Sequence, residues 1–85
     1  MESETRLLEK IRNYISKATL LNDDAIKNDT LIFELGLLDS MGLLFLIDFI
    51  KSEFNVDVND AELTKENFES VNNISEFVYN KLNIP

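Results

Sequence analysis

Two stretches of this 85-residue sequence hold side chains whose types and spacing can do chemistry. In the first, Asp39 and Ser40 place a carboxylate beside a hydroxyl, directly before the apolar run that begins at Met41. Either side chain can cap a helix, because each offers an oxygen to the unpaired backbone N–H groups of a first turn. The second stretch has the oxygen spacing of a calcium-binding EF-hand loop, in the pattern Asn55-x-Asp57-x-Asn59-Asp60-x₅-Glu66.

The calcium pattern departs from an EF-hand at two of its positions. Asn55 stands first, where the loop has Asp, and Asp60 stands sixth, where the sharp turn needs Gly. We therefore predict no specific metal site. A small acidic calcium-binding or interaction module without a prosthetic group stays open as an alternative function of a different class.

The residue types that the sequence lacks exclude several kinds of catalysis. There is no cysteine and no histidine, and there are only two glycines. Without these residues the chain has no thiol, no Ser–His nucleophile, no thiolate zinc site and no glycine-rich phosphate loop. We therefore expect that the protein is not an enzyme of the common hydrolase, dehydrogenase or kinase types.

The charge of the chain is strongly acidic, with 16 acids, 8 bases and a formal net charge of −8. Residues 39–69 hold eight acids against Lys51 and Lys65, a net charge of −6. Such a field repels nucleic acid and anionic membranes and steers basic protein surfaces toward the middle of the chain. No apolar run approaches the roughly 20 residues of a membrane span, and the acidic start lacks the features of a signal peptide. We expect one monomeric, cytoplasmic domain over residues 1–85, not embedded in a membrane.

Hydrophobic periodicity predicts three longer helices and one short one. They cover residues 3–19, 39–54, about 60–65 and about 70–82, with Ser3 capping the first. Gly36 is expected to be left-handed at the end of a turn around residues 31–35, and residues 55–60 to form an extended loop. The fold class is therefore all-α, a small antiparallel four-helix bundle. The expected core positions are Leu7, Leu8, Ile11, Ile15, Ala18, Leu43, Leu46, Ile47, Ile50, Phe54, Ile74, Phe77, Val78 and Leu82.

The helix over residues 39–54 has apolar residues on two sides. At 100° per residue, Met41, Leu44 and Phe45 point away from its core stripe, beside Asp48. Exposed apolar patches rimmed by charge commonly mark interaction surfaces. These four residues are thus predicted to bind partner proteins. The alternative is that the neighbouring loop covers them.

The segment Gly36-Leu37-Leu38-Asp39-Ser40-Met41-Gly42, at the junction of loop and helix, resembles the acyl carrier protein family. The resemblance extends over residues 4–82 and implies a four-helix bundle in which Ser40 receives covalent 4′-phosphopantetheine from coenzyme A. A phosphodiester at that place would face the unpaired N–H groups and the positive end of the helix dipole. The resemblance assigns Asp39 to recognition by the phosphopantetheinyl transferase, alongside its role as a cap.

The same resemblance leaves the cargo open. Fatty-acid carriers usually show Leu-Gly-x-Asp-Ser-Leu, whereas this chain has one more residue after Gly36 and has Met41 in the last place. Gly-Leu-Leu-Asp-Ser-Met-Gly and the segment 62–68 look like D-alanyl carrier proteins. The implied cargo is a fatty acyl, polyketide or aminoacyl group, held as a thioester. The implied partners are the transferase, an acyl- or aminoacyl-loading ligase, and acyl-transferring or condensing enzymes.

Overall fold

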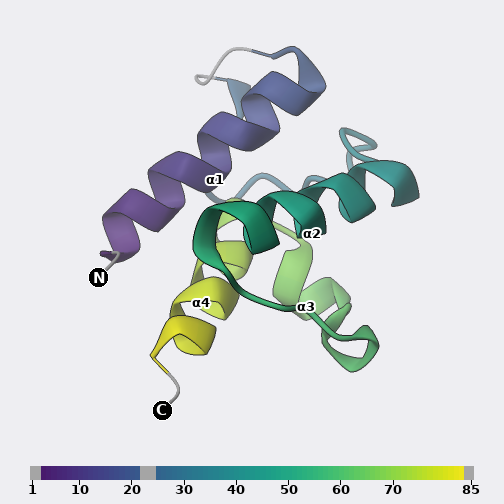
Figure 1. The fold of residues 1–85 in the computed structure, drawn as a ribbon. Helices are drawn as coiled ribbons and strands as arrows, with labels where there is room; N and C mark the ends of the chain where they lie inside the picture. The colour runs from purple at the N-terminus through teal and green to yellow at the C-terminus, as the bar shows by residue number, and fades with distance from the viewer. Residues whose placement is uncertain (1–2, 22–24, 84–85) are drawn as a thin grey trace.

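The computed structural model describes residues 3–21 and 25–83 (Figure 1). Its regular elements are α1 (Glu4–Thr19), α2 (Ser40–Phe54), the 3₁₀ turn η2 (Asp60–Glu62), α3 (Lys65–Phe68) and α4 (Val71–Leu82). The predicted all-α fold, with three longer helices and a short one, is confirmed. The predicted range of the first helix, residues 3–19, agrees with α1 to within one residue. Residues 22–24, where the sequence predicts that the loop opens, lie outside the described residues. No helix in the described part of the chain is long and apolar enough to cross a membrane.

Each of the four α-helices begins where a side chain caps its first turn. The side-chain oxygens of Ser3, Asp39, Thr64 and Ser70 each accept a hydrogen bond from the backbone N–H three residues later. Such caps pair N–H groups that have no partner within the helix. The predicted cap at Ser3 is confirmed, and of the two candidates at the start of α2 it is Asp39 that caps.

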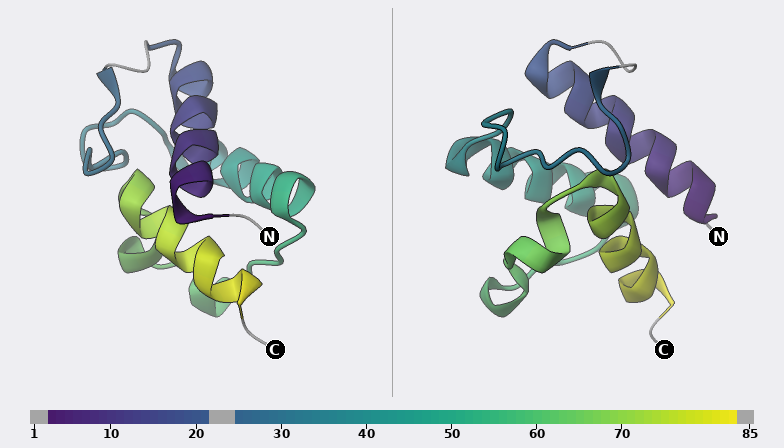
Figure 2. Two further views of the ribbon diagram at one scale, coloured as in Figure 1. Left: turned by 90° about the vertical axis from the view of Figure 1, so that its left-hand side faces the viewer. Right: turned by 180° about the vertical axis from the view of Figure 1, so that it is seen from behind.

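The helices enclose one apolar core. Figure 2 shows α1 and α4 running in roughly opposite directions, with α2 crossing α1 steeply and α3 lying beside α4. The buried apolar side chains come from every α-helix and from the loops: Leu7, Ile11, Ile15, Ile26, Ile32, Leu46, Ile50, Phe54, Val56, Phe68, Val71, Ile74, Phe77 and Val78.

Five of the expected core positions are less buried than predicted. Leu8, Leu43 and Ile47 are half-buried, and Ala18 and Leu82 are exposed. The two exposed residues lie in the last turns of α1 and α4, where the neighbouring helices no longer cover them. The other three flank the buried stripe of their helix.

The sequence analysis missed Phe49, which contributes to the contact between α1 and α2. Its ring stacks on Tyr14 with centroids 4.2 Å apart, and it meets Phe54 edge-on. Because α2 crosses α1 steeply, the side of α2 that faces α1 is centred nearer to Leu46, Phe49 and Ile50 than to Ile47.

Burial and the nearby Asp48 carboxylate raise the pKa of the Tyr14 phenol.

The short helix predicted over residues 60–65 is two elements. Asn59 and Glu62 form a reciprocal capping box around η2, and Thr64 then caps α3. A second cap so soon after the first starts a new helix rather than prolonging the old one. Residues 55–59 form neither a helix nor a ladder, so the predicted loop is confirmed there. It departs from the predicted extended conformation at its two ends, because Asn55 is left-handed and Asp60 begins η2.

The loop before α2 is fastened to the rest of the fold. Buried Ile32 donates its backbone N–H to the Glu69 carbonyl at 3.0 Å, and the Asn28 carbonyl accepts the Asn72 N–H at 2.9 Å. Gly36 has a φ of 73°, the left-handed conformation that the sequence predicts. These bonds anchor the loop at the α3–α4 junction and so fix where α2 begins.

Candidate functional site

The first turn of α2 leaves the Ser40 hydroxyl free. One Asp39 carboxylate oxygen accepts the Gly42 N–H at 2.9 Å, and the Asp39 carbonyl accepts the Leu43 N–H at 2.9 Å. Ser40 is the first residue of the helix and is exposed, and its hydroxyl has no hydrogen-bond partner among the described residues. Asp39 therefore does the capping, which leaves Ser40 available for modification.

The other serines are placed differently. Ser3 and Ser70 use their hydroxyls as helix caps. Ser52 is exposed but lies near the C-terminal end of α2, far from the free N–H groups of a helix start. The remaining two serines, Ser16 and Ser75, are buried. Ser40 is thus the serine that combines exposure, a helix N-terminus and a hydroxyl that no cap uses.

The backbone around Ser40 fits a phosphate ester. The N–H groups of Ser40 and Met41 have no acceptor within the described residues, because Asp39 satisfies only those of Gly42 and Leu43. Unpaired N–H groups and the dipole of a 15-residue helix both favour a negative charge at this end. The second Asp39 oxygen accepts no hydrogen bond from the described residues and can face an incoming protein or cation.

An apolar surface extends from Ser40 along α2. The side chains of Met41, Leu44 and Phe45 are 60%, 56% and 57% exposed, so the loop does not cover them. Together with exposed Asp48 they occupy positions i, i+3, i+4 and i+7, which share one side of a helix. The predicted orientation of these four residues, away from the core, is confirmed; their role in binding partners stays a prediction.

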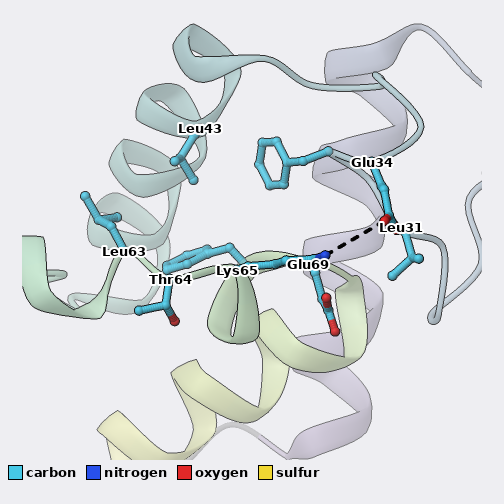
Figure 3. Close-up of a pocket in the computed structure, with 9 residues that line it drawn as sticks. Leu31, Glu34, Leu43, Leu63, Thr64, Lys65 and Glu69 are labelled. Atoms are coloured by element: carbon cyan, nitrogen blue, oxygen red, sulfur yellow. Dashed lines mark ion pairs between the residues drawn. The ribbon is translucent and has the colours of Figure 1, made fainter.

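A pocket of about 370 Å³ reaches α2 at Leu43, about one helical turn beyond Ser40 (Figure 3), and the sequence analysis did not predict it. It lies between the loop before α2, α2 itself and the α3 region. Its apolar wall includes Leu43, which follows Ser40 by three residues and therefore lies on the same side of α2. The Lys65 ammonium and the Glu34 carboxylate, 3.8 Å apart, form an ion pair at its edge. The apolar lining consists of Leu31, Phe33, Leu43, Leu63 and Phe68.

One signal in the sequence could have indicated this pocket. Leu31 and Phe33 are large apolar residues outside the predicted helices, so no helical stripe accounts for them. Such residues must pack on something if they are not to be exposed. Their meeting point depends on how the loop folds back over α2, which periodicity does not reveal.

Three residues of the calcium pattern have other roles in the fold. Asn55 is the left-handed cap at the end of α2, and an Asp57 oxygen lies 2.9 Å from the Lys51 ammonium. Asn59 caps η2, where its side-chain oxygen accepts the Glu62 N–H at 3.1 Å. Within the described ranges, no group of three or more acidic, His or Cys side chains is arranged to hold a metal ion.

Comparisons with known proteins identify the family. Residues 9–78 match the family model described as "Phosphopantetheine attachment site". A D-alanyl carrier protein from Lacticaseibacillus rhamnosus is 41% identical over 54 residues, which cover 62% of this chain and 67% of that protein. A "Probable acyl carrier protein PigG" from Serratia sp. (strain ATCC 39006) is 32% identical over 66 residues, 76% of each chain. The chain therefore belongs to the family of carrier proteins that use 4′-phosphopantetheine.

Proposed function

We propose that Ser40 is the attachment residue, and that this chain carries an acyl or aminoacyl group on a 4′-phosphopantetheine arm obtained from coenzyme A. One observation carries the proposal. Ser40 is exposed at the start of α2 with its hydroxyl unpaired, because Asp39 takes over the capping. The arm supplies the thiol that this polypeptide lacks and holds the cargo as a thioester.

The residues around Ser40 have distinct roles in this proposal. The free N–H groups of Ser40 and Met41 stabilise the phosphodiester, assisted by the dipole of α2. Asp39 holds the first turn with one oxygen. It presents the other to the transferase and to the Mg²⁺ that such a reaction uses.

The proposal assigns no catalytic step to this chain. It has neither Cys nor His, and Ser40 has no base among its hydrogen-bond partners in the described structure. The family implies partner enzymes, and we propose three kinds: the phosphopantetheinyl transferase, a loading ligase, and an acyl-transferring or condensing enzyme. A monomeric cytoplasmic domain over residues 1–85 stays a prediction.

The cargo has two candidate classes. The pocket reached through Leu43 has an apolar wall. This favours an acyl chain, because moving apolar surface out of water lowers the free energy. The similarity to a D-alanyl carrier protein favours a small amino acid. Of the two observations only the pocket concerns this chain's own structure, so we propose the apolar acyl group first and the aminoacyl group as the alternative.

Loading the protein with each cargo separates these candidates. Transferase with octanoyl- or alanyl-coenzyme A gives the two loaded forms, whose melting temperatures are compared with that of the unacylated holo form. An octanoyl chain in the pocket should raise the melting temperature by several degrees, and an alanyl group should not. Equal melting temperatures for the octanoyl and alanyl forms would contradict the apolar cargo.

The absence of cysteine provides a direct test of the carrier function itself. Because the polypeptide has no thiol, any thiol found by titration of the unfolded protein belongs to the arm. After incubation with transferase, Mg²⁺ and coenzyme A, followed by removal of small molecules, we expect one thiol per chain. Failure to acquire a thiol would reject the carrier proposal.

A further inference from the structure

The pocket that reaches α2 at Leu43 is apolar inside and charged at one end. Figure 3 shows Leu43 and Leu63 on one side of the pocket, whereas the dashed line between Lys65 and Glu34 lies on the other side. Leu43 is the lining residue that α2 contributes, about one helical turn beyond Ser40. An acyl chain that enters from Ser40 past Leu43 therefore runs toward the ion pair.

The two charged residues of this pair belong to different segments. Glu34 lies in the turn before α2, and Lys65 is the first residue of α3. The turn is closed by its own backbone, since the Leu37 N–H donates to the Ile32 carbonyl at 2.9 Å. It is fastened to the end of α3 by the Ile32 N–H, which donates to the Glu69 carbonyl at 3.0 Å. The ion pair thus bridges two separate segments across the end of the pocket.

The two fastenings of the turn differ in strength. The Ile32 side chain is fully buried, and its residue is held by a backbone hydrogen bond. The side chains of Glu34 and Lys65 are 55% and 72% exposed, and their charged atoms are 3.8 Å apart. An exposed pair of this kind contributes little stability, because water screens it and two long side chains must be held still. The end of the pocket can therefore open at Glu34 while the turn stays anchored at Ile32.

Lys65 has a second carboxylate within reach. Glu69 follows Lys65 by four residues, so their side chains are neighbours on one helical turn. Glu69 also lines the pocket, and its carboxylate accepts the Asn73 amide at 3.2 Å. A pair between Lys65 and Glu69 stays within one segment and does not bridge the pocket. An ammonium that leaves Glu34 thus finds another partner, which lowers the cost of opening.

The closed ion pair restricts what the pocket holds. An alkyl chain gains free energy along the apolar lining, and the gain grows with each methylene that leaves water. A methylene pressed against the charged groups removes water from them without offering a hydrogen bond in return. A chain that reaches the pair must therefore stop there or displace Lys65.

We propose that the Glu34–Lys65 ion pair closes the far end of the pocket and determines the longest acyl chain that the pocket shelters. This proposal rests on the proposed function, because it takes Ser40 as the attachment residue and an apolar acyl group as the cargo. Glu34 and Lys65 are then specificity-determining residues that meet the end of the cargo and not its thioester. When the pair opens, Lys65 turns toward Glu69 and a longer chain extends between the turn and α3.

The test loads the protein with a series of saturated acyl groups. Transferase, Mg²⁺ and butanoyl-, octanoyl-, dodecanoyl- or hexadecanoyl-coenzyme A give the loaded forms. The melting temperature of each form is compared with that of the unacylated holo form of the same variant, so that any effect of the substitution itself cancels. We define the length limit as the longest acyl group that still raises the melting temperature above that of the preceding member. Wild type should reach this limit within the series.

Matched variants show whether the ion pair sets the limit. Glu34→Gln and Lys65→Gln each break the pair, and the next acyl group beyond the wild-type limit should then raise the melting temperature by about 3 °C or more, which corresponds to at least one further buried methylene in a domain of this size. Glu34→Lys combined with Lys65→Glu restores the pair with exchanged charges and should restore the wild-type limit. Asp57→Asn breaks the exposed pair with Lys51, outside this pocket, and should leave the limit unchanged.

The outcomes separate this proposal from the proposed function. The same length limit in wild type, Glu34→Gln and Lys65→Gln would overturn the proposal, as would a rise that continues to the hexadecanoyl form of wild type. Either result leaves the proposed function standing, because an acyl group still stabilises the fold. If no acyl group raises the melting temperature of any variant, the apolar cargo and this proposal fail together, whereas one thiol per holo chain still supports the carrier function.

Discussion

The Asp39 carboxylate closes the first turn of α2 by accepting the backbone N–H of Gly42 at 2.9 Å. This bond encloses Ser40 without using its hydroxyl. A serine at the N-cap itself, such as Ser3 or Ser70, spends its oxygen on the helix. The order Asp-Ser therefore gives the helix its cap from one residue and leaves the hydroxyl of the next residue without a hydrogen-bond partner among the described residues.

Two substitutions of Asp39 should separate its structural role from its proposed role toward the transferase. Asn caps helices as well as Asp, so Asp39→Asn should leave the free energy of unfolding within about 0.5 kcal/mol of wild type. Asp39→Ala should lose about 1 kcal/mol. Both should slow modification of Ser40 by a similar factor, because both remove the carboxylate. Urea unfolding and transferase kinetics measure the two effects, and normal modification of Asp39→Asn would show that the carboxylate acts only as a cap.

The two sides of α2 should respond differently to truncation. Leu46→Ala and Ile50→Ala remove fully buried side chains and should each cost about 2–4 kcal/mol of unfolding free energy. Met41→Ala and Leu44→Ala remove exposed side chains and should each cost less than about 1 kcal/mol. Chemical denaturation of the four variants decides this. Similar losses on both sides would mean that the side of α2 that carries Met41 and Leu44 is covered in solution.

The Glu62–Lys81 pair should make stability depend on pH. The hydrogen bond from Lys81 and then that from the Asn59 N–H lower the pKa of Glu62 below its ordinary value of 4.5. A group whose pKa is lower in the folded state stabilises the fold above its unfolded pKa, and this contribution is lost as the pH falls through the folded pKa. Glu62→Gln should therefore reduce stability at neutral pH, and its difference from wild type should shrink as the pH falls below about 4.5.

The measurement is a series of urea unfolding curves from neutral to acidic pH. Glu76→Gln, which changes an exposed acid of α4, is the matched control. A Glu62→Gln difference that stays constant across the series would show that the ion pair does not contribute through its charge.

Periodicity and capping residues were enough to predict the three longer helices and the start of α2, but not the division of the short helix into η2 and α3. Ser3 and Asp39 act through contacts within four residues of the chain, so their roles can be predicted from local sequence alone. The exposed side of α2 was also predictable, because Met41, Leu44 and Phe45 are out of phase with the core stripe.

What the sequence analysis missed depends on contacts between distant segments. The stack of Phe49 on Tyr14 follows from the angle at which α2 crosses α1. The pocket that reaches α2 at Leu43 follows from the loop that Ile32 pins to Glu69. Neither the crossing angle nor the path of the loop leaves a periodic signal, so both required the structure.

The attachment of the arm to Ser40 is tested most directly by intact-mass spectrometry after incubation with transferase, Mg²⁺ and coenzyme A. Wild type and Ser40→Ala are compared with Ser52→Ala, which removes an exposed serine from the same helix. We predict one phosphopantetheine increment for wild type and for Ser52→Ala, and none for Ser40→Ala, which should stay helical because Asp39 still caps α2. An increment on folded Ser40→Ala would contradict the assignment.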